Sequence, residues 1–350
     1  MALADSNSHF VPRRGFQAGL NVDTLAYALF ALVSWPPFPV LTAALALTRN
    51  TLHSALPLLL LALLSLLLLA YLYLVHYPTR PIDWSQHTVV VTGGSHGIGL
   101  SLLHLLAATP ARLAVIDVSP LPDSAPTNAR LYRCDLSDAC AMEAAVACIK
   151  NDLGPVTMLV NNAGIVCPRL LADHSPLDVR RVLSVNALAP MLLTQMFLSD
   201  MLRQPHAHLI YVSSVLAFIG VPQVSSYCAS KAAVASFAES LRMELGCRMD
   251  AKHVRVSTVF PSMVDSGMFA GIKMPRWLSP RIQTEDVAEW IFWLMHYGRN
   301  SDVYMPLYAS LAPMYFALPN FVRRILHWVA GSIDSMRTFR GHGREPTISM

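Results

Sequence analysis

The feature that most constrains this chain is an uncharged apolar run over residues 55–75. It holds thirteen leucines in 21 residues and no acidic or basic side chain. As a helix it would rise about 31 Å, which matches the hydrocarbon thickness of a bilayer. At about −0.5 kcal/mol for each leucine, insertion gains roughly 6 kcal/mol, enough to tolerate Pro57 and Ser65. The run therefore predicts a transmembrane helix rather than a buried core helix.

A second uncharged run, over residues 24–48, leaves its structure open. Pro36, Pro37 and Pro39 interrupt it and remove backbone donors that lipid cannot replace. A kinked span, a re-entrant loop and a pair of short interfacial helices all remain compatible with this pattern. A cleaved signal peptide is a further alternative, because arginines precede the run and small residues follow it.

The alternatives for the second run predict opposite orientations. If both runs span, Arg13, Arg14 and Arg80 lie on one side and Arg49 on the other, and the positive-inside rule places the rest of the chain in the cytosol. If only residues 55–75 span, the balance of basic residues on the two sides of the membrane points to the opposite orientation. All six cysteines follow the anchor, and no Asn-x-Ser/Thr acceptor occurs. Both observations favour the cytosol.

The composition of the whole chain excludes several classes of protein. It is 54% apolar and 14% charged, where globular chains carry about 25% charge, so disorder, collagen and coiled coil are excluded. The net charge of +4 favours a membrane surface only weakly and gives no reason to expect a nucleic-acid partner.

Short apolar runs that alternate with Ala- and Leu-rich stretches predict an α/β domain over residues 84–306, after an N-terminal tail and anchor over residues 1–83. The expected strands lie at 87–92, 112–116, 131–134, 158–161, 208–212 and 254–259. Each is a nearly continuous apolar run, which is typical of parallel strands covered on both faces. We expect a single doubly wound parallel sheet, the Rossmann architecture.

A glycine-rich turn follows the first expected strand. Gly93, Gly97 and Gly99 would let the backbone approach a pyrophosphate, whose charge would face the amides at the start of the next helix. A tight strand-to-helix connection alone would give a similar turn. Eighteen residues past Gly99, however, Asp117 ends the second strand, where a carboxylate can accept from both adenosine ribose hydroxyls and repel a 2′-phosphate. This favours NAD over NADP, although His96 is a partial cation that points the other way.

This turn and several later motifs resemble those of the short-chain dehydrogenase/reductase family, in the same order. The motifs are Thr92-Gly93-Gly94-Ser95-His96-Gly97-Ile98-Gly99, Cys134-Asp135-Leu136, Asn161-Asn162-Ala163-Gly164, Ser184-Val185-Asn186, Ser213-Ser214 and Tyr227-x-x-x-Lys231. The resemblance implies cofactor contacts from Gly93, Ser95, His96, Gly97, Ile98, Gly99, Asp117, Asp135, Leu136, Asn162, Ala163, Gly164, Tyr227, Lys231, Pro261, Val264 and Ser266. It implies no metal.

Asn186, Ser214, Tyr227 and Lys231 form the expected catalytic set. Tyr227 and Lys231 are four residues apart and so neighbours on one helix face. An adjacent ammonium and an oxidised nicotinamide would lower the tyrosine pKa from its ordinary value near 10. The phenolate could then take the proton from a substrate hydroxyl as hydride leaves the carbon. Ser214 would hydrogen-bond the substrate oxygen, Lys231 would also hold the nicotinamide ribose, and Asn186 would position a water in a proton relay.

The chain departs from the family pattern after the sixth expected strand. The family usually has Pro-Gly-x-x-x-Thr there, whereas this chain has Pro261, Ser262 and, at the last position, Ser266. Ser266 keeps the hydroxyl that would meet the nicotinamide carboxamide. Without the glycine, fewer backbone conformations are accessible at that position. This difference gives no reason to expect an inactive protein.

Later segments are similar to a membrane-bound branch that contains epidermal-type retinol dehydrogenases and lipid-droplet 17β-hydroxysteroid dehydrogenases. They are residues 265–271, 275–277, 286–288 and 303–306. This resemblance implies a membrane-anchored oxidoreductase of lipophilic alcohols and carbonyls at the endoplasmic reticulum, lipid droplets or both, with a cytosolic catalytic domain. Met268, Phe269 and Met274 lie where a substrate loop would be and suit an apolar substrate. The family often pairs through the helices that bear Asn186 and Tyr227, so a homodimer is expected.

Residues 307–350 form an apolar tail whose first part is too interrupted, by Pro313 and Pro319, to span a membrane. It predicts a pocket lid with domain packing, an interfacial helix, or both. Two other functions stay open for the chain. One is an NADPH-dependent reductase of a lipid ketone, and the other is a non-catalytic scaffold that keeps the fold as a binding module.

Overall fold

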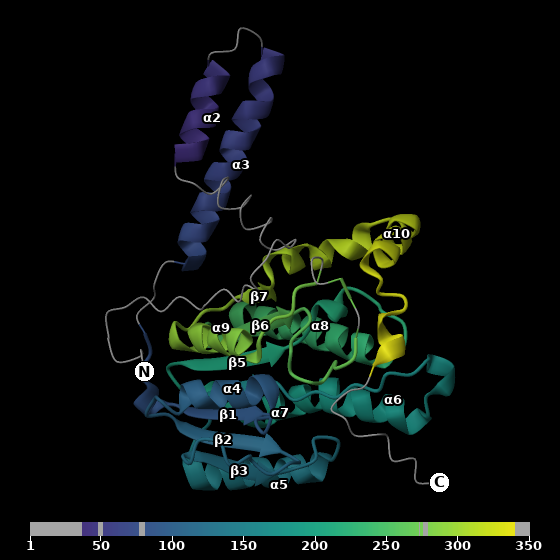
Figure 1. The fold of residues 1–350 in the computed structure, drawn as a ribbon. Helices are drawn as coiled ribbons and strands as arrows, with labels where there is room; N and C mark the ends of the chain where they lie inside the picture. Colours follow the sequence, from purple (N-terminus) through teal and green to yellow (C-terminus); the bar gives the residue numbers. More distant parts are fainter. Residues whose placement is uncertain (1–36, 48–51, 77–80, 273, 276–278, 340–350) are drawn as a thin grey trace. The chain divides into compact units, whose positions relative to one another are not determined.

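The computed structural model describes residues 37–47, 52–76, 81–272, 274–275 and 279–339. Its contacts separate residues 18–80 from the unit that contains residues 81–350. The larger unit is built on one parallel seven-stranded sheet of order β3-β2-β1-β4-β5-β6-β7 (Figure 1). The strands are β1 (Thr88–Thr92), β2 (Arg112–Asp117), β3 (Ala129–Arg133), β4 (Met158–Asn161), β5 (Ala207–Val212), β6 (Val254–Pro261) and β7 (Asp302–Met305). The predicted parallel Rossmann sheet is confirmed.

Helices cover both faces of the sheet. Helices α4 (Gly97–Leu106) and α9 (Thr284–His296) pack on one face, and α5 (Ala139–Leu153), α7 (Ala189–Met201) and α8 (Ser225–Cys247) pack on the other. Side chains alternate between the two faces along each strand. In β1, Val90 joins the core under α5 and α7, whereas Val89 and Val91 join the core under α4. The double cover explains why the strands are apolar on both sides.

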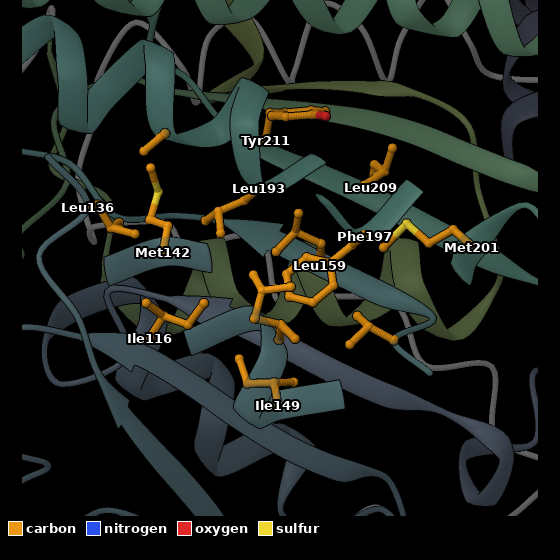
Figure 2. Close-up of a cluster of buried hydrophobic side chains, with 14 of the residues drawn as sticks. Ile116, Leu136, Met142, Ile149, Leu159, Leu193, Phe197, Met201, Leu209 and Tyr211 are labelled. Carbon is orange, nitrogen blue, oxygen red and sulfur yellow. The ribbon is translucent and has the colours of Figure 1, made fainter. Parts of the chain in front are cut away.

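The core under α5 and α7 centres on large, fully buried side chains (Figure 2). Phe197 of α7 lies beside Leu159 of β4, and Tyr211 of β5 shares a 2.7 Å hydrogen bond with the Thr194 hydroxyl of α7. That bond satisfies the phenol, whose pKa burial raises above its ordinary value. The sheet is therefore fixed to this helix layer by apolar packing and by a buried polar contact.

Helix α6 (Pro176–Leu183) runs through a π-helical turn, Ser184–Leu188, into α7. Ser175 and Asp178 form a capping box at its start. Among the residues whose side chains are described, Pro176–Met201 is the one helical stretch that is long and apolar enough to cross a membrane by length and composition, and half of its most apolar part is buried inside the domain. Ala55–Leu67 is a shorter apolar stretch by the same measure. The apolar character of Pro176–Met201 is therefore explained by the core of this domain.

The unit of residues 18–80 contains two helices that lie side by side, α2 (Pro37–Leu47) and α3 (Leu52–His76) (Figure 1). Among its described side chains the buried ones are small or polar, and most of the large ones are exposed, with Leu58 and Leu61 half-buried. The buried set is Thr42, Ala62 and Ser65. The exposed set includes Val40, Leu41, Leu59, Leu60, Leu63, Leu64, Leu66 and Leu67. This is the reverse of the distribution in a water-soluble helix pair. Residues 24–36 of the second apolar run lie outside the described residues.

Short 3₁₀ elements complete the larger unit. They are η1 (Trp84–Gln86), η2 (Leu171–Asp173), η4 (Val215–Ala217), η5 (Leu307–Ala317) and η6 (Ser335–Thr338), with helix α10 (Asn320–Ala330) between the last two. Trp84 fixes the segment before β1 to helix α9. Its ring stacks on Phe292 at a centroid distance of 5.2 Å, and its Nε1 donates a 3.0 Å hydrogen bond to His296.

Candidate active site

A cavity of about 620 Å³ opens at the carboxyl ends of the strands. Residues that follow β1, β2, β3, β4, β5 and β6 all line it, and α8 contributes one wall. The order of the sheet reverses between β1 and β4, and open α/β sheets bind ligands at such a point. The topology therefore brings together the motifs that lie far apart in the sequence.

The turn after β1 is closely packed and depends on glycine. Gly93 has φ +70°, and a Cβ there would lie 2.9 Å from the Ala163 Cα. A Cβ on Gly99 would lie 2.1 Å from the Gly93 carbonyl oxygen, which no side chain can accommodate. The turn thus keeps its backbone open to the cavity at the N-terminus of α4, where amides favour a phosphate.

Asn162 clamps this turn to the end of β4. Its Nδ2 donates to the carbonyl oxygens of Thr92 and Gly93, both at 3.0 Å. The Thr92 hydroxyl in turn accepts from the backbone amides of Asn162 and Ala163. These bonds fix the two central strand ends against each other, on the two sides of the cavity.

Asp117 ends β2 with its carboxylate held by backbone amides. Oδ2 accepts from the Ser95 amide at 3.0 Å, and Oδ1 accepts from the Ser119 amide at 2.9 Å. Ser95 itself is buried, and its hydroxyl donates to the Ser119 carbonyl. The carboxylate therefore has a fixed position at the rim of the cavity, where an adenosine ribose would lie.

Asp135 and Leu136 line the same end of the cavity. The Asp135 carboxylate accepts from the Ser137 amide and hydroxyl, and these bonds lower its pKa below the ordinary value. Arg181 of α6 lines the cavity here and lowers the same pKa further. This end of the cavity is therefore suited to the polar edge of an adenine ring.

Tyr227 lies at the opposite end of the cavity and is 5% exposed. Burial raises its pKa above the ordinary value, the nearby Cys228 thiol adds to this, and a hydrogen bond with Ser214 opposes it. The lowering of this pKa by Lys231 together with an oxidised nicotinamide stays a prediction. Lys231 Nζ lies 5.7 Å from the centre of the Tyr227 ring and donates to the carbonyl of Val212.

Ser214 and Asn186 occupy different environments. Ser214 lines the cavity; its hydroxyl accepts from the Leu216 amide at 3.1 Å and donates to the Pro261 carbonyl at 3.4 Å. Asn186 is buried in the π-helical turn behind the cavity, and its side chain exchanges two 2.8 Å hydrogen bonds with the backbone of Ile165. The Asn186 side chain thus holds the chain after β4 in place.

The tyrosine end of the cavity has an apolar wall. Phe269 meets the Tyr227 ring edge-to-face at a centroid distance of 5.6 Å, and Met268 lies next to it along the wall. Ile165 completes this side. Met274 packs in the same cluster without lining the cavity. An apolar molecule fits this end better than a charged one.

Most of the site residues expected from sequence line the one cavity. They are Gly93, His96, Gly97, Ile98, Asp117, Asp135, Leu136, Asn162, Ala163, Gly164, Ser214, Tyr227, Lys231, Pro261, Val264 and Ser266. Ser95, Gly99 and Asn186 lie behind it and support its walls. Sequence reasoning missed Ser119 and Arg181, because a loop serine and a helical arginine carry no motif. It also missed Arg133, which faces Asp117 in the strand register and donates to the Val118 carbonyl at the cavity rim.

The residues present fit a nicotinamide dinucleotide. The glycine turn leaves a cradle that a Cβ would fill, Asp117 has a fixed carboxylate, and Lys231 supplies a cation at the far end. The distance between these ends is covered by one continuous cavity. The arrangement combines a cofactor cleft with a buried acid/base pair.

Comparisons with known proteins point in the same direction. A family model described as short chain dehydrogenase matches residues 87–276. Dehydrogenase RED2 of Cochliobolus heterostrophus is 35% identical over 184 residues, 52% of this chain and 69% of that protein. Estradiol 17-beta-dehydrogenase 11 of Rattus norvegicus is 30% identical over 222 residues, 61% and 73% of the two chains. Retinol dehydrogenase 10-B of Danio rerio is 34% identical over 149 residues, 43% and 44%.

A similar fold occurs among solved structures. A short chain dehydrogenase from Burkholderia cenocepacia, in complex with NADP, superposes with a TM-score of 0.57 at 24% identity. The match covers 71% of this chain and 98% of that one. At this identity the likeness supports the fold.

Proposed function

This chain belongs to the short-chain dehydrogenase/reductase family of NAD(P)-dependent oxidoreductases, and we propose that it is a membrane-anchored member acting on a lipophilic alcohol or its carbonyl. One observation carries the proposal. Tyr227, Lys231 and Ser214 line the same cavity as the glycine turn, and Phe269 closes the tyrosine end with an apolar ring.

A nicotinamide dinucleotide held by these residues would supply or accept the hydride. The chain's own residues then manage the proton and the position of the substrate. The substrate oxygen accepts a hydrogen bond from Ser214, whose hydroxyl turns from the Pro261 carbonyl, its long partner at 3.4 Å. Tyr227 exchanges the proton with the same oxygen, as a general acid in reduction and a general base in oxidation.

Lys231 has a double role in this proposal. Its buried ammonium opposes the rise of the Tyr227 pKa when the phenol must ionise, and it holds the nicotinamide ribose. Asn186 acts as a positioning residue, because its side chain is bonded to Ile165 and its Oδ1 lies 3.6 Å from where a Cβ on Gly164 would be. In the proton relay that we propose, Asn186 fixes the backbone of Ile165, and this backbone helps to position the relay water.

A lipophilic substrate is supported by the wall around Tyr227. Phe269 and Met268 present apolar surface to the reacting end, and apolar contacts are the main source of affinity in small-molecule pockets. The names of two relatives, an estradiol dehydrogenase and a retinol dehydrogenase, suggest steroid-like or retinoid-like alcohols. We propose that class of substrate for this chain.

The anchor is proposed from α3. This helix has 25 residues, rises about 37 Å, and exposes leucines on its described part. Helix α2 covers residues 37–47 of the second run, and the kinked-span, re-entrant and short-helix alternatives for residues 24–48 stay open. We propose that residues 1–83 anchor the chain, that residues 84–306 form the catalytic domain, and that this domain faces the cytosol at the endoplasmic reticulum, lipid droplets or both.

We propose NAD as the preferred cofactor, because the fixed carboxylate of Asp117 would repel a 2′-phosphate. Arg133 supports the alternative, since it lies opposite Asp117 in the strand register and donates to the carbonyl of Val118, a residue that lines the cavity. That alternative is the NADPH-dependent reduction of a lipid ketone. Turnover measured with NADH and NADPH separates the two.

A homodimer is proposed through the outer face of α6 and α7. Leu177, Leu183 and Leu188 are exposed there. Leu183, Leu188 and Met191 line a shallow groove of about 460 Å³. The described face is therefore apolar on the side turned away from the core. A second copy of the chain is the occupant that the family resemblance suggests.

The test of the function is a Tyr227→Phe variant of the full chain in membranes. We expect loss of NADH formation from retinoid or steroid alcohols by about 10²-fold or more, with dinucleotide binding retained. Tyr132→Phe is the control, because its hydroxyl bonds Asp152 outside the cavity. An unchanged rate in Tyr227→Phe would refute the proposal, and dinucleotide binding without turnover on a broad lipid panel would favour the scaffold.

A further inference from the structure

The C-terminal part of the chain exposes a continuous group of large apolar side chains, here called the C-terminal apolar surface. Its members come from η5 and α10: Leu311, Met314, Phe316, Phe321, Ile325, Trp328 and Val329. Trp328 is 76% exposed and Phe321 is 66% exposed. No residue of α10 is buried, although this helix has a pronounced apolar face. An amphipathic helix of a water-soluble domain turns that face inward.

The orientation of α10 is fixed by its polar residues. The Tyr315 hydroxyl and His327 Nε2 share a 2.6 Å hydrogen bond, and His327 Nδ1 bonds the Ser332 hydroxyl at 2.6 Å. Arg323 donates to the carbonyls of Leu318 and Phe316. The polar side chains thus hold α10 against η5 from within, and the apolar side chains are left facing outward. The exposed face is therefore a built feature rather than a frayed end.

The apolar face of α10 also carries a cation. Phe321, Ile325 and Trp328 are spaced by four and three residues, so they share one face. Arg324 follows Phe321 by three positions and precedes Trp328 by four, and it is exposed. An arginine between two aromatic rings can lay its stem on apolar surface and place its guanidinium at the level of headgroups.

The charge within residues 307–333 has one sign, and the next residue, Asp334, is paired with Arg337. Residues 307–333 contain Arg323 and Arg324 and no Asp or Glu. Aromatic and aliphatic side chains with basic ones and no acids are the composition of helices that lie in the interface of anionic bilayers. A protein partner would more often be matched by charges of both signs.

The same segment continues to the substrate end of the cavity. After α10, Met336 is buried in a cluster with Tyr227 and Ile272. Phe339 contacts Phe269 edge-to-face at 6.5 Å, and the Thr338 hydroxyl donates to the Gly271 carbonyl at 2.7 Å. The chain that carries the C-terminal apolar surface therefore also packs on the loop that covers the catalytic tyrosine.

We propose that the C-terminal apolar surface docks on the headgroup region of an anionic phospholipid bilayer and that lipid-dissolved substrate enters the cavity beside it. This contact is additional to the N-terminal anchor. The part that concerns substrate entry rests on the proposed function, whereas the docking itself does not. Phe321 and Trp328 are the side chains that enter the acyl boundary, and Arg324 meets the phosphates.

Docking is tested with the full chain in vesicles of phosphatidylcholine and phosphatidylserine, made with ordinary or with brominated acyl chains. Bromine quenches indole emission at short range. The signal of Trp328 is obtained as the difference between the wild type and Trp328→Phe, which removes the contribution of the other tryptophans. We expect that difference signal to be lost largely in brominated vesicles, and to be quenched less when phosphatidylserine is left out.

A second measurement tests the role in substrate loading. The variant Phe321→Glu/Trp328→Glu changes two exposed side chains, so the fold is retained, and Met249→Glu is the matched control, at a residue that is 46% exposed outside the surface. We expect a several-fold higher KM for a retinoid or steroid alcohol supplied in vesicles, with kcat unchanged. For a short water-soluble alcohol, KM and kcat should both stay as in the wild type. Met249→Glu should leave KM and kcat unchanged for both substrates.

The outcomes separate the two proposals. Equal Trp328 emission in brominated and ordinary vesicles would overturn docking, whatever the enzyme activity. A second copy or another segment of the chain that covers the surface would also keep bromine away from Trp328, so this outcome overturns docking as well. If no alcohol is turned over while Trp328 is quenched, docking stands and the proposed function fails.

Discussion

Lys231 Nζ donates a 2.8 Å hydrogen bond to the carbonyl oxygen of Val212, the last residue of β5, and not to Tyr227 one helical turn before it. The lysine is 4% exposed. Burial lowers the pKa of its ammonium from 10.5 to about 8. The hydrogen bond thus holds the ammonium at the end of β5, beside the cavity, although burial destabilises its charged form.

This burial predicts a pH dependence of stability. A lysine whose folded pKa is lowered binds fewer protons in the folded state, so the free energy of unfolding rises with pH between about 8 and 10.5. Relative to Lys231→Met, the wild type should gain about 2 kcal/mol between pH 8 and pH 10. Chemical unfolding of both proteins in one detergent measures the difference. A difference that does not vary with pH would contradict the buried ammonium.

Asp117→Asn should weaken the preference for NADH. The change keeps one of the two oxygen acceptors that the amides of Ser95 and Ser119 use, and it removes the charge that repels a 2′-phosphate. We expect the ratio of kcat/KM for NADH to that for NADPH to fall roughly 10-fold or more, as for loss of one charged hydrogen bond. Asp123→Asn, on an exposed loop, is the control. An unaltered ratio would show that the Asp117 charge does not set the cofactor preference.

Gly99→Ala should open the glycine turn. The added Cβ would lie 2.1 Å from the Gly93 carbonyl oxygen and 2.8 Å from Asn162 Nδ2, so the clamp on the turn must shift. We expect a loss of about 1–3 kcal/mol in stability and strongly reduced dinucleotide binding. Gly246→Ala lies in α8 with nothing within 4 Å, and it should leave binding intact. Titration of cofactor fluorescence distinguishes the two variants.

Leu188→Glu should separate the proposed homodimer. The side chain is 50% exposed at the junction of the π-helical turn with α7, on the groove that faces away from the core. A buried carboxylate in a dimer interface is costly, whereas in a monomer it stays in water. Light scattering in detergent should show half the protein mass of the wild type. Equal masses for the two proteins would exclude this face as the dimer contact.

The strands could be predicted because their apolar runs are continuous. Residues 158–161 agree with β4 at both ends, and the other five expected strands agree with β1, β2, β3, β5 and β6 to within two residues. β7 was missed, since its four residues at the sheet edge begin with an exposed aspartate and give no apolar run. Its position became clear only from pairing with β6, a contact between residues far apart in the chain.

The candidate site was predictable where a motif fixes a local shape. The glycine turn and the Tyr227 and Lys231 spacing are local, so the cavity could be anticipated around them. The opposing rise of the Tyr227 pKa by burial could not be anticipated, because it depends on Phe269 and on neighbours from other elements. For the same reason the side chain of Asn186 could not be placed behind the cavity, on Ile165, from its motif alone.

The strand order has a consequence for biogenesis. β1 lies between β2 and β4, so one edge of β1 stays unpaired until the ribosome has produced β4. During that interval the valines at 89–91 form an open template for intermolecular pairing. The nascent chain is most prone to aggregate then, and chaperones should engage it before Asn162 closes the centre of the sheet.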